Sequence, residues 1–525
     1  MRAVAADVRR LILPLKHTIR ASLRRLLQIS GGPQITFWFA GGAIAVEPAL
    51  DAFYPAGGAL GTTNVVTAIG KFESWPPKVW VNDAALTFTA ETNKGKFSVA
   101  IASDAVPGPR LVRLYNDEGA SEPRAFVIGE GRELTEAEPN NHFIKPQSIN
   151  KLPATINGRL DKSGDVDSFA IGVRAGQWLD ARVDCYTLMS KVDAVLRLVS
   201  TNGQQLAWNH DFVTLDPRLV WRAPTDQTVV LQIFGFAYPP GSDIRLTGGD
   251  DAVYRLHIAM TNNLPAVCDF ATEREPNNGV EDAQDIEAPA LVHGAIAVAD
   301  DEDRFQFSAK KNEFIEVRVE AASFGSPLDA WLKIEDSAGN QLARNDDAEG
   351  SRDPRLEWKV PTDGTFVAAI GSVTHRGGED FCYRLAVQRV EPDYRATLSA
   401  SSLVLTGGAT NELKLELKRL RGFTNELMPI FQNLPDGVTV LTTNLPQKDG
   451  TASIRISVAT NAPNFQGPVQ LALTDSKTKR QRTVRAELTT RGETGFNHLL
   501  VEETDPFWLT VRQKPASDQK APTKK

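Results

Sequence analysis

The chain has 525 residues, of which 42% are hydrophobic and 23% charged, a composition that excludes a disordered or collagen-like protein. At roughly 100 to 200 residues per domain, this length predicts about three to five domains. The net charge of −7 is made up of +6 over residues 1–34, +4 over residues 511–525 and −17 between them. This acidic body excludes nucleic acid as a partner, because it would repel a phosphate backbone.

The first 45 residues have the pattern of an export signal. A basic stretch precedes an apolar run of 11 residues, Ile35 to Ala45, which ends in Ala43-Ile44-Ala45. This order predicts a signal or targeting segment over residues 1–45, with cleavage after Ala45 left open, and a location at the cell surface, in the periplasm or outside the cell. An amphipathic segment lying on a protein or membrane surface is the alternative. No other stretch is apolar for the 18 or more residues of a spanning helix, so no transmembrane span is predicted in the mature chain.

Residues 51–129 begin with a Gly-rich segment and continue through KVWV, KFSVAIA and RLVRLYN. Short apolar or alternating runs between turn residues are typical of strands, and their spacing predicts a seven-stranded immunoglobulin-like sandwich.

The next two segments, residues 133–262 and 268–392, are duplicates of each other. EAEPNN at 136–141 recurs as EREPNN at 273–278, DVDSF at 165–169 as DEDRF at 301–305, and DPRLVWRAPTD at 216–226 as DPRLEWKVPTD at 353–363. Blocks in one order at a near-constant offset indicate a duplicated domain. Strand patterns such as SFAIGV and YRLHIAM, without helical windows, predict an antiparallel β-sandwich or jelly roll for each copy.

The chain continues through residues 393–490, where ELKLELKRL and ASIRISVAT alternate strictly and predict a further immunoglobulin-like sandwich. Residues 511–525 are rich in Lys, Pro and Ala and predict a disordered basic tail. The fold class is therefore all-β, with tandem antiparallel sandwiches after the N-terminal segment. Three cysteines exclude a full disulfide framework, and both a Cys268–Cys382 bridge and three free thiols stay open.

The duplicated unit resembles the bacterial pre-peptidase C-terminal (PPC) domain, a family that includes the collagen-binding modules of bacterial collagenases. The resemblance rests on the opening E-x-E-P-N-N, the D-x-D-x-F turn into a strand, the N-G-x-x-L hairpin and the closing Y-R-L strand. Residues 51–129, with PAGGxxGT, look like IPT/TIG-type modules. The resemblance implies a secreted, non-catalytic sandwich stiffened by Ca²⁺. Carried over to this sequence, the implied ligands are Glu136, Glu138, Asn140, Asp165 and Asp167 in the first copy and Glu273, Glu275, Asn277, Asp301 and Asp303 in the second.

Chemistry gives these residues two interpretations. Carboxylate and amide oxygens are the ligands that Ca²⁺ prefers, and the second copy adds Asp300, Asp346, Asp347 and Glu349, where the first has His210 in place of Asp346. Asn and Asp before a strand are also ordinary turn formers. Trp221 and Trp358, at equivalent places, are predicted to pack in the cores, whereas Trp75 and Trp80 could form an exposed aromatic face.

Catalysis is not predicted. The sequence contains no H-E-x-x-H, G-x-S-x-G, P-loop or C-x-x-C pattern. We therefore expect an exported, non-enzymatic protein for adhesion or for binding an extracellular protein or polysaccharide. The alternative is a non-catalytic partner of an exported peptidase or glycoside hydrolase.

Overall fold

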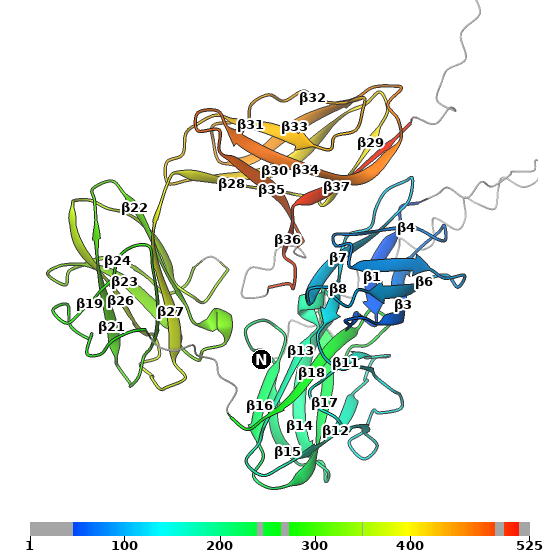
Figure 1. The fold of residues 1–525 in the computed structure, drawn as a ribbon, viewed down its shortest axis with the longest axis horizontal. Coiled ribbons are helices and arrows are strands. Elements are labelled where there is room, and N and C mark those ends of the chain that lie inside the picture. The colour runs from blue at the N-terminus through cyan, green and yellow to red at the C-terminus, as the bar shows by residue number, and fades with distance from the viewer. Residues whose placement is uncertain (1–45, 239–244, 264–271, 349, 489–497, 514–525) are drawn as a thin grey trace, which may run out of the picture. The chain divides into compact units, whose positions relative to one another are not determined.

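The computed structural model describes residues 46–238, 245–263, 272–348, 350–488 and 498–513 (Figure 1). These residues form strands and two short 3-10 turns, which confirms the all-β fold class. Within this part of the chain, no helix has the length and apolar character needed to cross a membrane. The predicted signal over 1–45 lies outside the described residues, as do Cys268 with its predicted bridge and Glu349.

The N-terminal sandwich consists of two four-stranded sheets. One has the order β1 (Ala49–Tyr54), β3 (Thr63–Lys71), β6 (Lys96–Ile101), β5 (Leu86–Ala90). The other has the order β2 (Gly57–Ala59), β8 (Arg124–Gly129), β7 (Gly108–Tyr115), β4 (Lys78–Val81). The Gly-rich segment supplies β2, which runs parallel to β8 and is one strand more than the seven expected.

We call residues 133–262 the first repeat and residues 272–392 the second repeat. In the first repeat, one sheet has the order β10 (Gln147–Ile149), β12 (Asp167–Val173), β17 (Gln227–Ala237), β14 (Val192–Ser200), β15 (Gln205–Asn209). The other has the order β16 (Arg218–Arg222), β13 (Trp178–Asp184), β18 (Val253–Thr261), β11 (Ala154–Arg159), β9 (Glu133–Thr135).

The sheets of the second repeat follow the same order. One is β19 (Gln284–Asp285), β21 (Glu302–Ala309), β26 (Gly364–Ser372), β23 (Ala330–Asp336), β24 (Gln341–Asn345). The other is β25 (Arg355–Lys359), β22 (Phe314–Glu320), β27 (Cys382–Val390), β20 (Ala290–Ala295). Among the described residues, this second sheet has no counterpart of β9.

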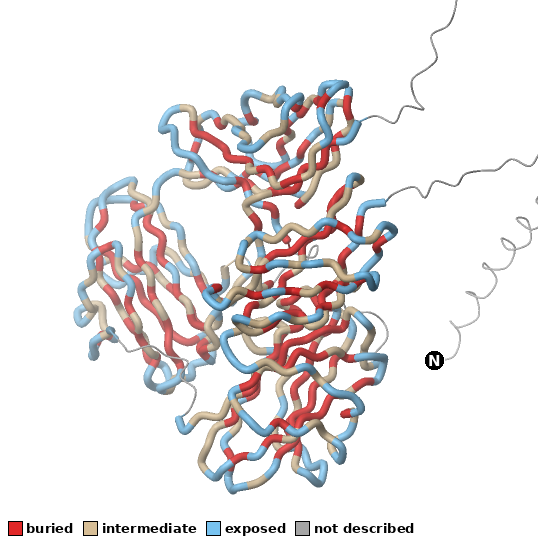
Figure 2. Tube along the Cα trace, turned by 45° about the vertical axis from the view of Figure 1, so that its right-hand side comes forward, coloured by how far each residue is buried: buried red, intermediate tan, exposed pale blue. Residues whose placement is uncertain are grey.

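Alternation along each strand separates the core from the outer face. On β13, Leu179, Ala181 and Val183 are buried in the core of the first repeat, whereas the residues between them point outward. Figure 2 shows this pattern as buried residues along the strands and exposed residues in the loops. Each large aliphatic side chain that is fully buried contributes about 1.5 to 3 kcal/mol to folding.

The D-P-R-L segment of each repeat anchors a 3-10 turn. The carboxylate of Asp216 accepts backbone N–H bonds from Cys185, Tyr186 and Thr187 at 2.8 to 3.0 Å. The Asp353 carboxylate does the same for residues 321 to 323, also at 2.8 to 3.0 Å. An acceptor that satisfies three N–H groups at a chain reversal explains why the same Asp stands before Pro in both copies.

The C-terminal sandwich extends beyond the predicted end at residue 490. Its strands are β28 (Asp393–Leu398), β29 (Ser402–Thr406), β30 (Thr410–Leu420), β31 (Leu427–Gln432), β32 (Val438–Val440), β33 (Gly450–Val458), β34 (Phe465–Asp475), β35 (Gln481–Glu487), β36 (Glu503–Thr504) and β37 (Pro506–Arg512). Strand β37 pairs with both β29 and β34, and Val511 is buried. The predicted tail over 511–525 is thus wrong at its start, because Val511 and Arg512 belong to a strand.

Candidate functional site

The strongest grouping of acidic side chains in the first repeat is a trio of carboxylates. One ligand atom each from Glu136, Glu138 and Asp167 lies within 4.8 Å of the others. The two glutamates come from the E-x-E segment that follows β9, and Asp167 is the first residue of β12. We call this the first carboxylate group.

Burial makes the first carboxylate group electrostatically costly. Asp167 is fully buried, and burial together with the nearby charge of Glu136 raises its pKa to about 10. Burial likewise raises the pKa of Glu136 to about 7. Tyr254 donates a hydrogen bond of 2.7 Å to Oδ2 of Asp167, but Oδ1 of Asp167 has no hydrogen-bond partner among the described residues.

Asn140 completes the first carboxylate group. Its backbone N–H donates to Glu138 at 2.9 Å, and its side chain is buried. Within the described part of the chain, Oδ1 of Asn140 has no hydrogen-bond donor, like Oδ1 of Asp167. Buried oxygens without donors are rare in proteins, and a cation is one partner that satisfies several of them together.

The second repeat forms the same arrangement from Glu273, Glu275 and Asp303, the second carboxylate group. Burial and the charge of Glu273 raise the pKa of Asp303 to about 8, and burial raises the pKa of Glu273 to about 7. Tyr383 donates hydrogen bonds to Asp303 at 2.7 Å and to Glu273 at 3.0 Å.

The amide of Asn277 lies against the second carboxylate group. One end of this amide is 3.2 Å from both Oδ1 of Asp303 and Oε2 of Glu275. With the nitrogen there, Asn277 donates two hydrogen bonds to the carboxylates. With the oxygen there, the amide adds a further oxygen ligand, which only a cation between the oxygens could stabilise.

Two of the residues implied as ligands have a different task. Asp165 accepts hydrogen bonds from the Asn141 side chain and from the backbone N–H of Asp161 at 2.7 Å. Asp301 accepts from Asn278 and from the Ala297 N–H, both at 2.9 Å. Neither belongs to a carboxylate group, because both precede their strands and close the turn instead.

The extra acidic residues of the second repeat lie elsewhere. Asp346 and Asp347 act on Asp329, whose pKa is raised by burial and by their charge, and Asp300 pairs with His375 at 2.7 Å. The corresponding place in the first repeat holds Asp193, His210 and Asp211, with His210 Nε2 3.2 Å from Asp193. The second carboxylate group, as the described residues form it, therefore consists of Glu273, Glu275 and Asp303 without Asp300, Asp346 or Asp347.

The tryptophans pack as expected for core residues. Trp221 lies against the core of the first repeat, and Trp358 meets Phe366 at 4.7 Å between ring centroids in the second. Trp75 packs on Phe97 at 5.1 Å and donates a hydrogen bond to the Glu91 carbonyl, so it does not belong to an exposed aromatic face.

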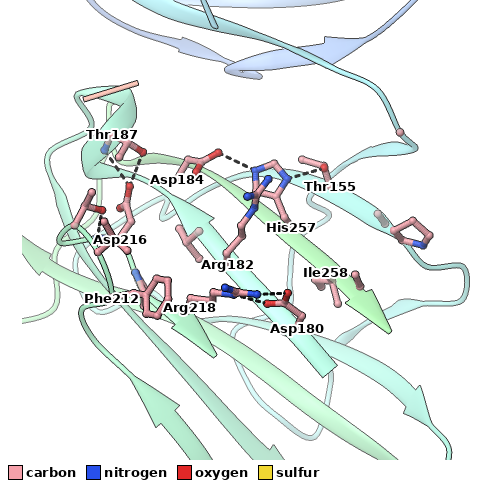
Figure 3. Close-up of a pocket in the computed structure, with 18 of the residues that line it drawn as sticks. Thr155, Asp180, Arg182, Asp184, Thr187, Phe212, Asp216, Arg218, His257 and Ile258 are labelled. Carbon is pink, nitrogen blue, oxygen red and sulfur yellow. Dashed lines mark hydrogen bonds and ion pairs between the residues drawn. The ribbon is translucent and has the colours of Figure 1, made fainter. Parts of the chain in front are cut away.

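Sequence reasoning missed a polar surface on the β13 and β18 sheet. Figure 3 shows its side chains lining a pocket. His257 bridges two residues there: its Nε2 is 2.7 Å from Oδ2 of Asp184, and its Nδ1 is 2.9 Å from Oγ1 of Thr155. Burial would raise the pKa of Asp184, but the hydrogen bond and charge of His257, with the neighbouring arginines, lower it below its usual value.

No family model matches the chain. A probable subtilase-type serine protease of Deinococcus radiodurans is 34% identical over 101 residues, which are 19% of this chain and 14% of that protein. Because the match spans so little of the protease, its activity does not carry over.

Three solved structures show likeness at low similarity. The PPC domain of a Bacillus anthracis collagenase is 14% identical and covers 22% of this chain and 100% of its own, with a TM-score of 0.18. Fibronectin(III)-like modules of Clostridium thermocellum CbhA are 9% identical, covering 48% of this chain and 98% of theirs, with a TM-score of 0.14. Domains 1–6 of the surface layer protein SbsC are 9% identical, covering 84% of this chain and 54% of that chain, with a TM-score of 0.14. These scores carry no argument about function.

Proposed function

We propose that this chain is an exported, non-catalytic protein that binds an extracellular protein or polysaccharide, and that each repeat holds one Ca²⁺. The observation that carries the calcium sites is the twin carboxylate groups. Each combines three carboxylates with one buried Asn, and each buries one aspartate completely. Without a cation such a group must protonate or repel itself, whereas Ca²⁺ neutralises it and accepts hard oxygen ligands.

The residues that would hold the ion are Glu136, Glu138, Asn140 and Asp167 in the first repeat and Glu273, Glu275, Asn277 and Asp303 in the second. In each case the glutamates and Asn lie in the segment that enters the repeat, while the aspartate is the first residue of β12 or the second residue of β21. A cation bound by both would fasten the entering segment to the sheet. This would stiffen the repeats from within, as a protein exposed to the extracellular medium requires.

Metal content tests the proposal directly. The full chain, dialysed against calcium and then against metal-free buffer, should retain two calcium ions per chain by elemental analysis. Replacing Asp303 by Asn should reduce this to one, and replacing Asp167 by Asn as well should remove the second. The matched controls Asp165→Asn and Asp301→Asn should keep both ions, since those side chains close turns. Retention of no calcium by the parent chain would refute the sites.

A second candidate function is a non-catalytic partner of an exported hydrolase. The 101-residue similarity to a probable serine protease favours it, because it shows that part of this sequence type occurs in one chain with such an enzyme. Co-elution of the chain with a secreted peptidase from the same culture medium, in size-exclusion chromatography, would support this role. Elution of the chain alone at micromolar concentrations of both would contradict it.

A further inference from the structure

A row of polar side chains crosses the outer face of one sheet in the first repeat. Strand pairing places Arg218 opposite Arg182, Arg182 opposite His257, and His257 opposite Thr155. Directly paired residues point to the same face, and neighbouring strands are about 4.8 Å apart. The four side chains therefore form one line over β16, β13, β18 and β11, which we call the polar row (Figure 3).

The second repeat shows that the fold does not require the polar row. The equivalent line there is Arg355, Arg318, Ala386 and Leu291, on β25, β22, β27 and β20. Both arginines are kept, but Ala386 occupies the position of His257, and Leu291 occupies the position of Thr155. Leu291 is 59% exposed, so this end of the line is not part of a core. The His and Thr of the first repeat therefore serve something other than folding.

Within the described residues, this exchange also leaves Arg182 of the first repeat without a hydrogen bond or ion pair, although its charge helps to lower the pKa of Asp184. In the second repeat, Arg318 is paired with Glu320 at 3.3 Å and lies 3.8 Å from Glu316. In the first repeat, Asp184 and Asp180 take the places of Glu320 and Glu316, and both are hydrogen-bonded to residues other than Arg182. Asp184 is bound by His257, and Asp180 accepts two hydrogen bonds from Arg218 at 2.8 and 2.9 Å.

Arg182 is exposed and makes no hydrogen bond or ion pair with any described residue. A guanidinium presents several donors in one plane and binds carboxylates with two parallel bonds. Beside it, His257 holds Asp184 with one ring nitrogen and Thr155 with the other, and the Thr155 hydroxyl oxygen can accept a further hydrogen bond. The surface thus combines the exposed guanidinium of Arg182 with the hydroxyl of Thr155 over a span of about 10 Å, which is two strand spacings.

We propose that the polar row binds an acidic oligosaccharide, with a uronate carboxylate on Arg182 and a sugar hydroxyl on Thr155, which His257 holds in place. This deepens the proposed function by naming the ligand class. A carbohydrate suits this surface because a uronate carries its carboxylate and several hydroxyls on one rigid ring, matching the guanidinium of Arg182 and the hydroxyl of Thr155. The ring of Phe212 lines the same pocket and offers an apolar face to a sugar ring.

The same contacts could be taken for a hydrolytic relay, in which His257 accepts a proton from the Thr155 hydroxyl. The backbone N–H of Thr155, however, is committed to the Arg132 carbonyl at 2.9 Å. A nucleophile of this type needs free N–H donors beside it for the developing oxyanion. The polar row therefore fits binding rather than acyl transfer.

Calorimetric titration of the full chain with trigalacturonate tests the proposal. The parent chain should bind it, and neither the neutral maltotriose nor triglutamate should compete. Arg182→Ala should weaken binding at least tenfold, while the matched control Arg318→Ala in the second repeat should leave it unchanged. The double variant Thr155→Leu with His257→Ala, which installs the residues of the second repeat, should also lose at least tenfold.

The inference is overturned if the parent chain does not bind trigalacturonate at millimolar concentration, or if Arg182→Ala binds it as well as the parent does. Tighter binding of triglutamate would assign the row to an acidic protein partner and would equally overturn it. Calcium content separates this outcome from the proposed function, since two retained ions without sugar binding would refute the polar row alone. Thermal midpoints within a degree or two of the parent would confirm that the surface variants are folded.

Discussion

The second carboxylate group predicts a dependence of stability on both pH and calcium. The pKa of Asp303 is raised from 3.8 to about 8 in the folded chain by burial and by the charge of Glu273. Between these two values the folded state keeps a proton that the unfolded state has released. Without metal, stability is therefore greatest below about pH 4 as far as this group is concerned, and it falls as the pH rises to 8.

The size of the effect follows from the same shift. Each pKa unit corresponds to about 1.4 kcal/mol, so four units make the loss at pH 8 up to about 6 kcal/mol for Asp303. Calcium should act in the opposite direction, because it binds the deprotonated carboxylates of the folded state only. At a hundred times its dissociation constant it would contribute about 2.7 kcal/mol.

Thermal melting measured in an Asp167→Asn background isolates the calcium response of the second repeat. With chelator, the midpoint should fall from pH 5 to pH 8, and millimolar calcium should raise it at pH 8 but hardly at pH 5. Adding Asp303→Asn should remove the response to calcium and weaken the pH dependence, since an amide keeps the shape without the charge. Burial of Glu273, whose pKa is raised to about 7, should keep part of the pH dependence. Adding Asp301→Asn instead should lower every midpoint but keep both dependences. An equal midpoint at pH 5 and 8 in chelator would refute the reasoning.

Three further predictions concern the fold. Asp353→Ala should destabilise the second repeat by at least about 3 kcal/mol in denaturant unfolding, because it leaves three backbone N–H groups without an acceptor. A loss of stability below about 1 kcal/mol would contradict the role of Asp353 in holding the 3-10 turn. Leu385→Ala should lower the free energy of unfolding by about 2 to 5 kcal/mol, because Leu385 is buried. Leu291→Ala on the adjacent strand should change it by less than about 0.5 kcal/mol, because Leu291 is exposed. Val511→Ala should destabilise the C-terminal sandwich by about 1 kcal/mol or more, and Arg512→Ala should not, if β37 completes the sheet; equal effects would contradict that assignment.

The sequence was informative wherever a local pattern decides the outcome. Alternation predicts the strands because a residue's face depends only on its place in the strand. The same pattern in Phe507, Leu509 and Val511 would have revealed β37, but the Lys-rich and Pro-rich composition around it favoured a tail. Composition describes a whole segment, whereas pairing with β29 and β34 depends on a few alternating side chains.

The carboxylate groups were predicted only in part. Asp165 and Asp167 were expected together because the resemblance to PPC domains implied both residues of the D-x-D turn as ligands. The strand begins only at Asp167, and the carboxylate of Asp165 accepts a hydrogen bond from the backbone N–H of Asp161. Where a strand begins depends on the hydrogen bonds of the turn before it, and the residue letters do not show these.

The polar row could not be read from one repeat, because Thr155 and His257 are 102 residues apart and meet only through the register of β11 with β18. The duplication nevertheless sorts the polar residues by what they do. Asp216 with Asp353, and Tyr254 with Tyr383, hold the same contacts in both copies, as structural residues must. His257 and Thr155 have no such counterparts, although the sheet beneath them is the same. A duplicated fold keeps two copies of what folding requires, so our proposal places a difference in ligand binding at a polar contact that the described residues form in one copy alone.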